Sequence, residues 1–229
     1  MVESELMDDP SLDKREHQKA LAGLARLNRF GDAPGMIWDE LSGLAKTPGH
    51  GGLSILDIAT GSGDVPVQLA RIARKAGAIL SIHACDISEY ALGEAKQRAT
   101  KADVEVTTFT LNAVTDQIPR EYDVVMCSLF MHHLPEEAVV EVLYKMKAAA
   151  RKMVLVNDLL RNRKTYAMAV GASHLLSRSK VVHVDAALSV CAAFSVPEMD
   201  ALAERAGLKD AVVRPWRFGR MLLKWERER

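Results

Sequence analysis

The sequence predicts a single α/β domain of 229 residues, with a doubly wound, mostly parallel sheet, an antiparallel C-terminal strand and a helical cap. Three observations predict this fold. Short apolar runs alternate with longer amphipathic ones, which is typical of parallel strands covered by helices on both faces. The length suits one domain with a full core and is too short for two. Two further short strands follow the last long helix and can pair with each other.

Residues 50–160 are expected to form the core of this domain. The expected strands are residues 53–58, 79–85, 104–110, 123–128 and 153–157. They are short and apolar, and residues 104–110 are rich in β-branched side chains, which favour strands. The expected helices are residues 65–76, 88–100 and 135–150. Pro66 is tolerated in the first turn of the first helix, and Ser88 is a good N-cap for the second.

Residues 195–229 are expected to complete the sheet. The segment Ser195-Val-Pro-Glu198 has the pattern of a capping box, so a helix begins there, and Gly207 ends it. Residues 211–216 and 220–225 predict two strands joined by a tight turn at Gly219.

Residues 11–47 and 160–194 do not fit the alternation of strands and helices. Neither has the composition of a linker, and we expect both to cap the carboxyl end of the sheet, where open α/β sheets bind ligands. Arg29 and Phe30 are expected either to close over a ligand or to form an ordinary helix end. In the second segment, the residues that suit either an apolar wall for a small molecule or the cap's own core are Met168, Leu175, Leu176, Val181, Val182 and Leu188.

Composition and charge exclude several classes of protein. Lys plus Arg equal Asp plus Glu at 30 each, so no net charge draws the chain to nucleic acid or to an anionic membrane. Apolar runs stay below the ~20 residues that span a bilayer. The three cysteines are too widely spaced for a disulfide framework or a zinc site, and the acidic first residues differ from an export signal. We therefore expect a cytoplasmic protein with no nucleic-acid partner and no membrane span.

The loop after the first strand is the most informative segment. Gly61 and Gly63 lie where the chain turns from strand into helix, and glycine there lets the backbone approach a ligand closely. A dinucleotide site wants a third small residue, but Pro66 stands at that position. Asp57 and Asp64 flank the loop with negative charge, which disfavours a pyrophosphate and suits a ligand with an ammonium and a sulfonium. A nicotinamide cofactor is therefore disfavoured.

The pattern Asp-x-Ala-x-Gly-x-Gly over residues 57–63 resembles the first motif of the class I S-adenosylmethionine-dependent methyltransferases, which are Rossmann-like. The resemblance implies S-adenosyl-L-methionine as cofactor. Asp86, at the end of the second strand, would bind both ribose hydroxyls. Asn112 follows the third strand where the family usually has Asp, and its oxygen would accept the adenine amino group. The cofactor-binding residues that the resemblance implies are Asp57, Ala59, Gly61, Gly63, Asp64, Asp86, Ile87, Asn112, Ala113 and Ser128.

Residues 131–135, Met-His-His-Leu-Pro, extend the resemblance to the small-molecule branch that includes the quinone-biosynthesis methyltransferases. Relatives that methylate hydroxyl groups often place a His–acid pair where this chain has His132 and Asp158. An imidazole can accept a hydroxyl proton at neutral pH, so His132 is the candidate base and Asp158 its partner. A second candidate pair is His183 with Asp185, which would share one face of an extended segment.

Two related chemistries are disfavoured. The segment after the fourth strand, Ser128-Leu129-Phe130, lacks the Pro-Pro pattern of methylases that act on the amino groups of DNA bases. Catechol-type enzymes bind magnesium through an acid after the fourth strand and an acid–Asn pair after the fifth. Asn157-Asp158 resembles the second half, but Cys127-Ser128 lacks the first, so no metal is expected.

We expect O-methylation of a hydrophobic small molecule that is aromatic, phenolic or polyketide-like. Two alternatives stay open: C-methylation of a phenol or quinone ring, and a catalytically inactive cofactor-binding subunit that serves a partner. The sequence also leaves a homodimer open.

Overall fold

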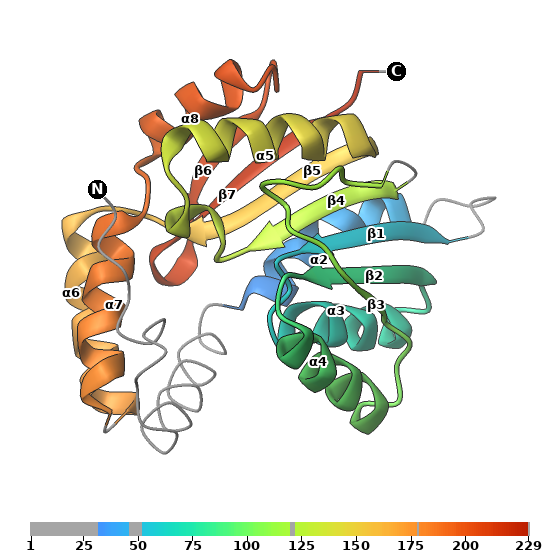
Figure 1. Cartoon of the computed structure of the whole chain (residues 1–229), viewed down its shortest axis with the longest axis horizontal. Coiled ribbons are helices and arrows are strands. Elements are labelled where there is room, and N and C mark those ends of the chain that lie inside the picture. Colours follow the sequence, from blue (N-terminus) through green and yellow to red (C-terminus); the bar gives the residue numbers. More distant parts are fainter. Residues whose placement is uncertain (1–31, 46–51, 120–121, 178, 229) are drawn as a thin grey trace.

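The computed structural model describes residues 32–45, 52–119, 122–177 and 179–228. Within these ranges seven strands form one sheet in the order β3-β2-β1-β4-β5-β7-β6 (Figure 1). The first five in sequence are parallel, β7 is antiparallel to β5, and β6 is antiparallel to β7. This confirms the predicted fold class. The strands are β1 (Leu53–Ile58), β2 (Leu80–Asp86), β3 (Thr107–Thr110), β4 (Tyr122–Ser128), β5 (Ala150–Leu159), β6 (Val212–Trp216) and β7 (Arg220–Glu226).

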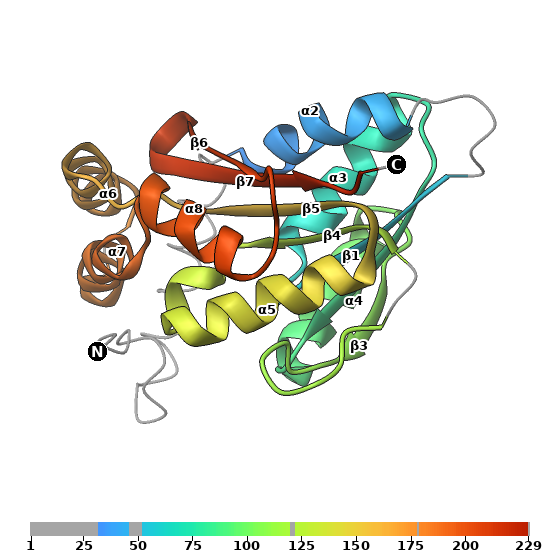
Figure 2. The ribbon, with the colours of Figure 1, turned by 90° about the horizontal axis from the view of Figure 1, so that it is seen from above.

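Helices cover both faces of the sheet (Figure 2). One buried cluster joins α2 to the face that carries Ile55, Met126 and Leu222, with α3 packed beside α2. The other joins α5 and α8 to the opposite face. The described α-helices are α2 (Ala33–Ala45), α3 (Asp64–Lys75), α4 (Glu89–Lys101), α5 (Glu136–Ala149), α6 (Arg163–Leu176), α7 (Lys180–Ala192) and α8 (Val196–Arg205). The 3-10 turns are η2 (Met131–His133) and η3 (Arg217–Gly219). Each helix in the described ranges is too short or too polar to cross a membrane.

The fifth strand is longer than expected. It begins at Ala150 and ends at Leu159, because it is paired on both sides: Ala150 lies opposite Tyr122 of β4, and Leu159 lies opposite Arg220 of β7. The third strand is shorter than expected and begins at Thr107. Residues 104–106 precede it, and the amide of Val104 closes the end of α4 by donating to the carbonyl of Ala99.

The segment 160–194 forms two helices, α6 and α7, which pack against each other beyond the carboxyl ends of β4 and β5 (Figures 1 and 2). We call this pair the hairpin. Its two ends meet, because Leu160 and Phe194 form a β-bridge and the amide of Arg161 donates to the carbonyl of Phe194. Val181 and Val182 are buried, but Met168 and Leu175 are 45% and 84% exposed. The expected apolar wall is therefore only partly formed by these residues, since the helices turn some of them outward.

The described part of the segment 11–47 differs from a cap over the carboxyl edge. Helix α2 lies on a face of the sheet, where Met36, Ile37 and Leu41 are fully buried against strand side chains. Its apolar residues recur at helical spacing, so one side of the helix joins the core. Arg29 and Phe30 lie outside the described residues.

The loop between β1 and α3 generates a prediction about packing. Gly61 and Gly63 both have positive φ, at 54° and 70°. A Cβ on Gly63 would lie 2.7 Å from the Cβ of Ala95 in α4, whereas a Cβ on Gly61 would meet nothing within 4 Å. Both alanine substitutions therefore cost about 1 kcal/mol for the left-handed backbone. Only Gly63→Ala adds overpacking, of roughly 1–3 kcal/mol.

Urea unfolding should thus show that Gly63→Ala lowers the free energy of unfolding more than Gly61→Ala does. Combining Gly63→Ala with Ala95→Gly should recover the overpacking part in a double-mutant cycle. Equal losses for the two single variants, with no coupling to Ala95, would contradict this account of the α3–α4 contact.

Candidate active site

The carboxyl ends of the parallel strands lie side by side along one edge of the sheet. Ile58 is opposite Cys85 on one side and Cys127 on the other, and Ser128 is opposite Asn157. The segments that follow these strands therefore meet at this edge, which we call the carboxyl edge. The structure gathers here the ends of all the strands that carry predicted site residues, so these residues belong to one region. Their side chains differ in burial and in hydrogen bonding.

Asp57 is buried at the end of β1 with only part of its carboxylate satisfied. Its side chain is 1% exposed, and its Oδ2 accepts a hydrogen bond of 2.6 Å from the hydroxyl of Thr60. Its Oδ1 accepts none from the described residues. Burial raises the pKa of Asp57 to about 7, and the nearby carboxylates of Asp64 and Asp86 add to the rise against the hydrogen bond from Thr60. A cation placed beside Asp57 would relieve this cost.

Other buried polar atoms at the carboxyl edge also lack a hydrogen-bond partner among the described residues. They are Oγ of Ser128 and both polar atoms of the Asn157 amide. The strand registers place Asp57, Ser128 and Asn157 on the same face of the sheet, the face that α2 covers. Buried polar groups are rarely left unpaired. Their concentration here is what a binding site for a polar ligand requires.

Backbone strain accompanies these side chains. Ala59 and Leu129, which directly follow β1 and β4, have φ values of 52° and 56°. The left-handed region is costly for residues with a Cβ, and such positions concentrate at functional sites. The amide of Leu129 donates to the carbonyl of Asn157 at 2.8 Å, which holds this turn against β5.

Asp86 links the ends of β1 and β2. Its Oδ2 accepts from the amide of Gly61 at 2.8 Å, and its Oδ1 accepts from the amide of Ser88 at 2.9 Å. Each carboxylate oxygen can accept more than one hydrogen bond, so Asp86 retains capacity for two hydroxyl groups. Ile87, next in the chain, is 65% exposed.

Asn112 lies in the loop that follows β3. Its Oδ1 accepts the amides of Val114 at 3.0 Å and Thr115 at 3.4 Å, so the oxygen serves the loop itself. The loop is held from outside as well, because the buried Lys145 of α5 donates from Nζ to the carbonyl of Val114 at 2.6 Å. Ala113 between them is buried.

His132 and Asp158 come together as the sequence predicts. His132 Nδ1 lies 2.6 Å from Asp158 Oδ1, and the His132 amide donates to Oδ2 at 3.2 Å. Both side chains are buried, at 4% and 1% exposed. Burial alone would raise the pKa of Asp158, but the charge of His132, hydrogen bonds from His132 and Leu159, and the charge of Arg220 together lower it. Asp158 is therefore held ionised beside the imidazole.

Arg220 is a residue of this edge that sequence reasoning missed. It begins β7 opposite Leu159 and is only 5% exposed. Burial lowers its pKa to about 10, while the charges of Asp158 and Asp64 oppose that shift. A charged residue at the start of an apolar strand, just after a tight turn, was the available signal. Without the β5–β7 pairing, nothing in the sequence places it beside these acids.

The second candidate pair, His183 with Asp185, does not form. The prediction of an extended segment was wrong, because these residues lie in helix α7, where positions two apart point in different directions. His183 Nε2 instead lies 2.9 Å from the carbonyl of Ser177, and its ring stacks on His174 with centroids 3.9 Å apart. Across the ranges that the structure describes, no three His, Cys, Asp or Glu side chains are grouped to hold a metal ion.

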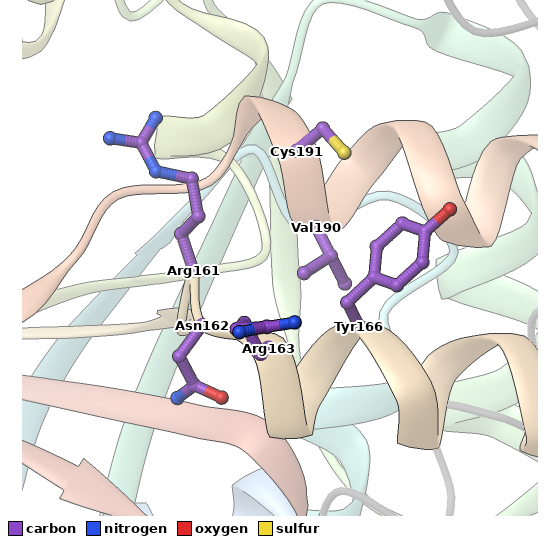
Figure 3. Close-up of a pocket in the computed structure, with 6 residues that line it drawn as sticks. All are labelled: Arg161, Asn162, Arg163, Tyr166, Val190 and Cys191. Carbon is purple, nitrogen blue, oxygen red and sulfur yellow. The ribbon is translucent and has the colours of Figure 1, made fainter.

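A cavity of about 610 Å³ opens between the start of α6 and the end of α7 (Figure 3). Its lining residues are Arg161, Asn162, Arg163, Tyr166, Val190 and Cys191. None of them is a predicted site residue. Two lining groups already serve the fold: Arg161 forms an ion pair with Glu198 of α8, and the Asn162 side chain caps α6 by accepting from the amide of Thr165.

The raised pKa of Asp57 generates a prediction about stability. The folded pKa of about 7 lies above the unfolded value of roughly 3.9. Folding is then favoured by the protonated form, and this contribution is lost as the pH rises from about 4 to 7. Asp57→Asn removes the titration. The free energy of unfolding of the natural chain, relative to this variant, should therefore fall between pH 5 and pH 8.

Asp123→Asn is the matched control. Burial acts to raise the pKa of Asp123, but bonds from Ser54 and the charge of Lys152 lower it overall. Its stabilising contribution is complete above the unfolded pKa of about 3.9. The difference in the free energy of unfolding between the natural chain and Asp123→Asn, measured in urea, should thus stay constant from pH 5 to pH 8. If the difference in the free energy of unfolding between the natural chain and Asp57→Asn were also constant, Asp57 would be ionised over the whole range from pH 5 to pH 8.

Comparison with known proteins gives the family. A family model described as a methyltransferase domain matches residues 55–153. A ubiquinone biosynthesis O-methyltransferase from Azoarcus sp. is 30% identical over 173 residues, which cover 67% of this chain and 70% of the relative. One from Pseudomonas entomophila is 28% identical over 129 residues, covering 55% and 53%. The chain spans about half the length of most curated relatives it matches.

Solved structures show the same fold. A magnesium protoporphyrin IX methyltransferase from Synechocystis, with bound S-adenosylhomocysteine, has a TM-score of 0.61 at 16% identity over 96% of this chain and 90% of that one. An O-methyltransferase family 2 protein from Planctomyces limnophilus, in complex with apigenin, has a TM-score of 0.66 at 19% identity over 96% and 63%. The solved structures show the fold alone, whereas the sequence match to the Azoarcus relative and the matching domain model show the family. The chain belongs to the class I S-adenosylmethionine-dependent methyltransferases of the quinone-biosynthesis type.

Proposed function

We propose that this chain transfers a methyl group from S-adenosyl-L-methionine to a hydroxyl group of a hydrophobic, aromatic small molecule. The observation that carries the proposal is the buried His132–Asp158 pair, with 2.6 Å between Nδ1 and Oδ1. It lies at the edge where polar atoms of Asp57, Ser128 and Asn157 have no hydrogen-bond partner among the described residues. A proton acceptor and a polar ligand site thus lie at the ends of neighbouring strands. Methyl transfer to a hydroxyl group can make use of both.

The residues of the edge fit the cofactor. The carboxylate of Asp57 suits an ammonium group, because burial and the nearby carboxylates of Asp64 and Asp86 raise its pKa and a cation would offset both effects. Asp86 has acceptor capacity for two ribose hydroxyls while it holds the amides of Gly61 and Ser88. When bound, the cofactor supplies an electrophilic methyl group on a positively charged sulfur. Asp57, Ser128 and Asn157 would hold its methionine portion.

His132 would act as the base. Its Nδ1 faces the carboxylate of Asp158, which is held ionised, so Nδ1 carries the proton and Nε2 has the lone pair. The substrate hydroxyl would give its proton to Nε2, and Asp158 would stabilise the imidazolium that forms. Helix α7 packs against η2, the turn that holds His132, and so limits the access of water to this proton transfer.

The substrate class rests on the relatives and on the hairpin. Curated relatives are named ubiquinone biosynthesis O-methyltransferases, which favours a phenolic hydroxyl over a ring carbon as the methyl acceptor. Val181 and Val182 are apolar residues of α7, the helix that packs against η2, the turn that holds His132. Turnover of a phenolic acceptor without an added partner would separate an active enzyme from a cofactor-binding subunit.

The role of His132 is tested by substitution. His132→Ala should lower turnover of alkyl-substituted catechols by ~10²–10⁴-fold, the range for a positioned general base. Asp158→Asn should also impair turnover, because an amide cannot stabilise the imidazolium. Binding of S-adenosylhomocysteine, measured by calorimetry, should change little in either variant. Rising pH should partly rescue His132→Ala as the phenol ionises near pH ~10.

His133→Ala is the matched control, because its ring lies beside that of His132 with centroids 4.1 Å apart but is exposed to solvent. It should keep near-normal turnover. If His132→Ala also kept near-normal turnover, alignment alone would suffice and the proposed base would be excluded.

Arg220 should tune this base. The positive charge of Arg220 partly neutralises the negative charge of Asp158. When Arg220 is replaced by a neutral residue, the carboxylate of Asp158 therefore stabilises the imidazolium of His132 more strongly. Protonated His132 should therefore be more stable in Arg220→Met, and the acidic limb of the pH profile of kcat/KM should move to higher pH. Arg220→Lys, which keeps the charge, should largely restore the limb. A lower kcat with an unmoved limb would assign Arg220 a purely structural role.

A further inference from the structure

We propose that the cavity at the base of the hairpin is a second ligand site, which binds a small aromatic carboxylate. The cavity of about 610 Å³ lies between the start of α6 and the end of α7, and its lining includes none of the residues proposed for methyl transfer (Figure 3). Small-molecule sites typically have volumes of roughly 300–1,000 Å³, so a ligand of this class fits. The proposal goes beyond the proposed function and does not rest on it.

Apolar surface forms the part of the cavity where the two helices face each other. Val190 of α7 and Tyr166 of α6 both line it, and Figure 3 shows their side chains pointing toward each other. Val190 is only 1% exposed, whereas Tyr166 is 45% exposed, so the tyrosine ring offers open surface to a ligand. An aromatic ring can pack on that surface in an offset-stacked or edge-to-face arrangement. The cavity therefore suits a ligand with a flat, apolar body.

Positive charge lies at the end of the cavity where α6 begins. Arg161 and Arg163 both line the cavity, and none of the lining residues is acidic. The charge of Arg161 is already neutralised, because its guanidinium forms an ion pair with Glu198 of α8. Arg163 forms no hydrogen bond or ion pair with any residue in the described ranges. Its N–H donors are therefore available to an anion.

The two features together select the ligand. Tyr166 follows Arg163 by three residues, so the two side chains lie on the same side of α6. A ligand whose ring packs on Tyr166 can therefore place an anionic group at Arg163. A planar guanidinium binds a carboxylate through two parallel hydrogen bonds, and one available arginine balances one negative charge. A doubly charged phosphate ester would keep a second charge beside the apolar surface, so the carboxylate is favoured.

Cys191 provides a direct measure of whether the cavity is occupied. It lines the cavity and is exposed, whereas the other two cysteines of the chain, Cys85 and Cys127, are buried. Iodoacetamide should therefore react first at Cys191, and a ligand in the cavity should slow this reaction. The ratio of the rates with and without ligand, taken within one variant, removes any effect of a substitution on the reactivity of the thiol.

The test uses 2-naphthoate and 2-naphthamide, which share a ring system and differ in charge. 2-Naphthoate should slow the alkylation of Cys191, and its half-maximal concentration should be at least about fivefold lower than that of 2-naphthamide. Arg163→Gln should remove most of this difference, because it removes the charge and keeps much of the side chain. Arg71→Gln, which removes an exposed arginine of α3, is the matched control and should keep the difference.

The aromatic part of the site is tested in the same assay. Tyr166→Ala should weaken the protection by 2-naphthoate several-fold, whereas Tyr166→Phe keeps the ring and should keep the protection. Saturating S-adenosylhomocysteine should leave the protection unchanged, because the site at the carboxyl edge uses other residues.

Several results would overturn the proposal. Alkylation of Cys191 at the same rate with and without 2-naphthoate would exclude binding in the cavity. Equal protection by 2-naphthamide, or unchanged protection in Arg163→Gln, would exclude recognition of the carboxylate by Arg163. Unchanged protection in Tyr166→Ala would exclude the ring contact. Loss of the protection on addition of S-adenosylhomocysteine would show one shared site in place of two.

Discussion

The pairing register of the parallel strands is the constraint on which the site depends. Because Ile58 lies between Cys85 and Cys127, β1 ends one residue before β2 and β4. A slip of one residue would turn Asp57 to the opposite face and bring Ile58 into its place. The two buried clusters, one on each face, oppose such a slip, because the apolar strand residues already pack into one cluster or the other. Core packing thus sets the position of the polar atoms.

Charge is distributed unevenly along the carboxyl edge. At the β5 end, Asp158 is buried but balanced by His132 and Arg220, and its pKa is lowered. At the β1 end, Asp57 is buried without such balance, and its pKa is raised to about 7. A ligand that carries positive charge gains most beside Asp57. Proton acceptance is best served beside Asp158. In the proposed function, the β1 end would hold the positively charged cofactor and the β5 end would accept the proton.

Much of this could be predicted from the sequence. Strands β1 and β4 are continuous apolar runs, and both were placed to within a residue. The pair of His132 and Asp158 was predictable because each follows a neighbouring parallel strand, although its role stays a prediction. The hairpin could not be read as two helices, because its apolar residues surround the chain without a clear period. The bonds of Asn112 and the position of Arg220 depend on a local turn and on strand pairing, which spacing alone does not reveal.

The closed base of the hairpin has a consequence for how such enzymes diversify. Because Leu160 and Phe194 form a β-bridge, the chain leaves the core domain and returns to it at the same point. Residues 161–193 therefore form an insertion with adjacent ends. A change in the length of this segment need not shift the strand pairing of β5, although α6 and α7 also contact η3 and η2. His132 and Asp158, which lie in η2 and β5, would keep their place when such a segment is exchanged. Chimaeras joined at this bridge are the natural way to redirect the enzyme.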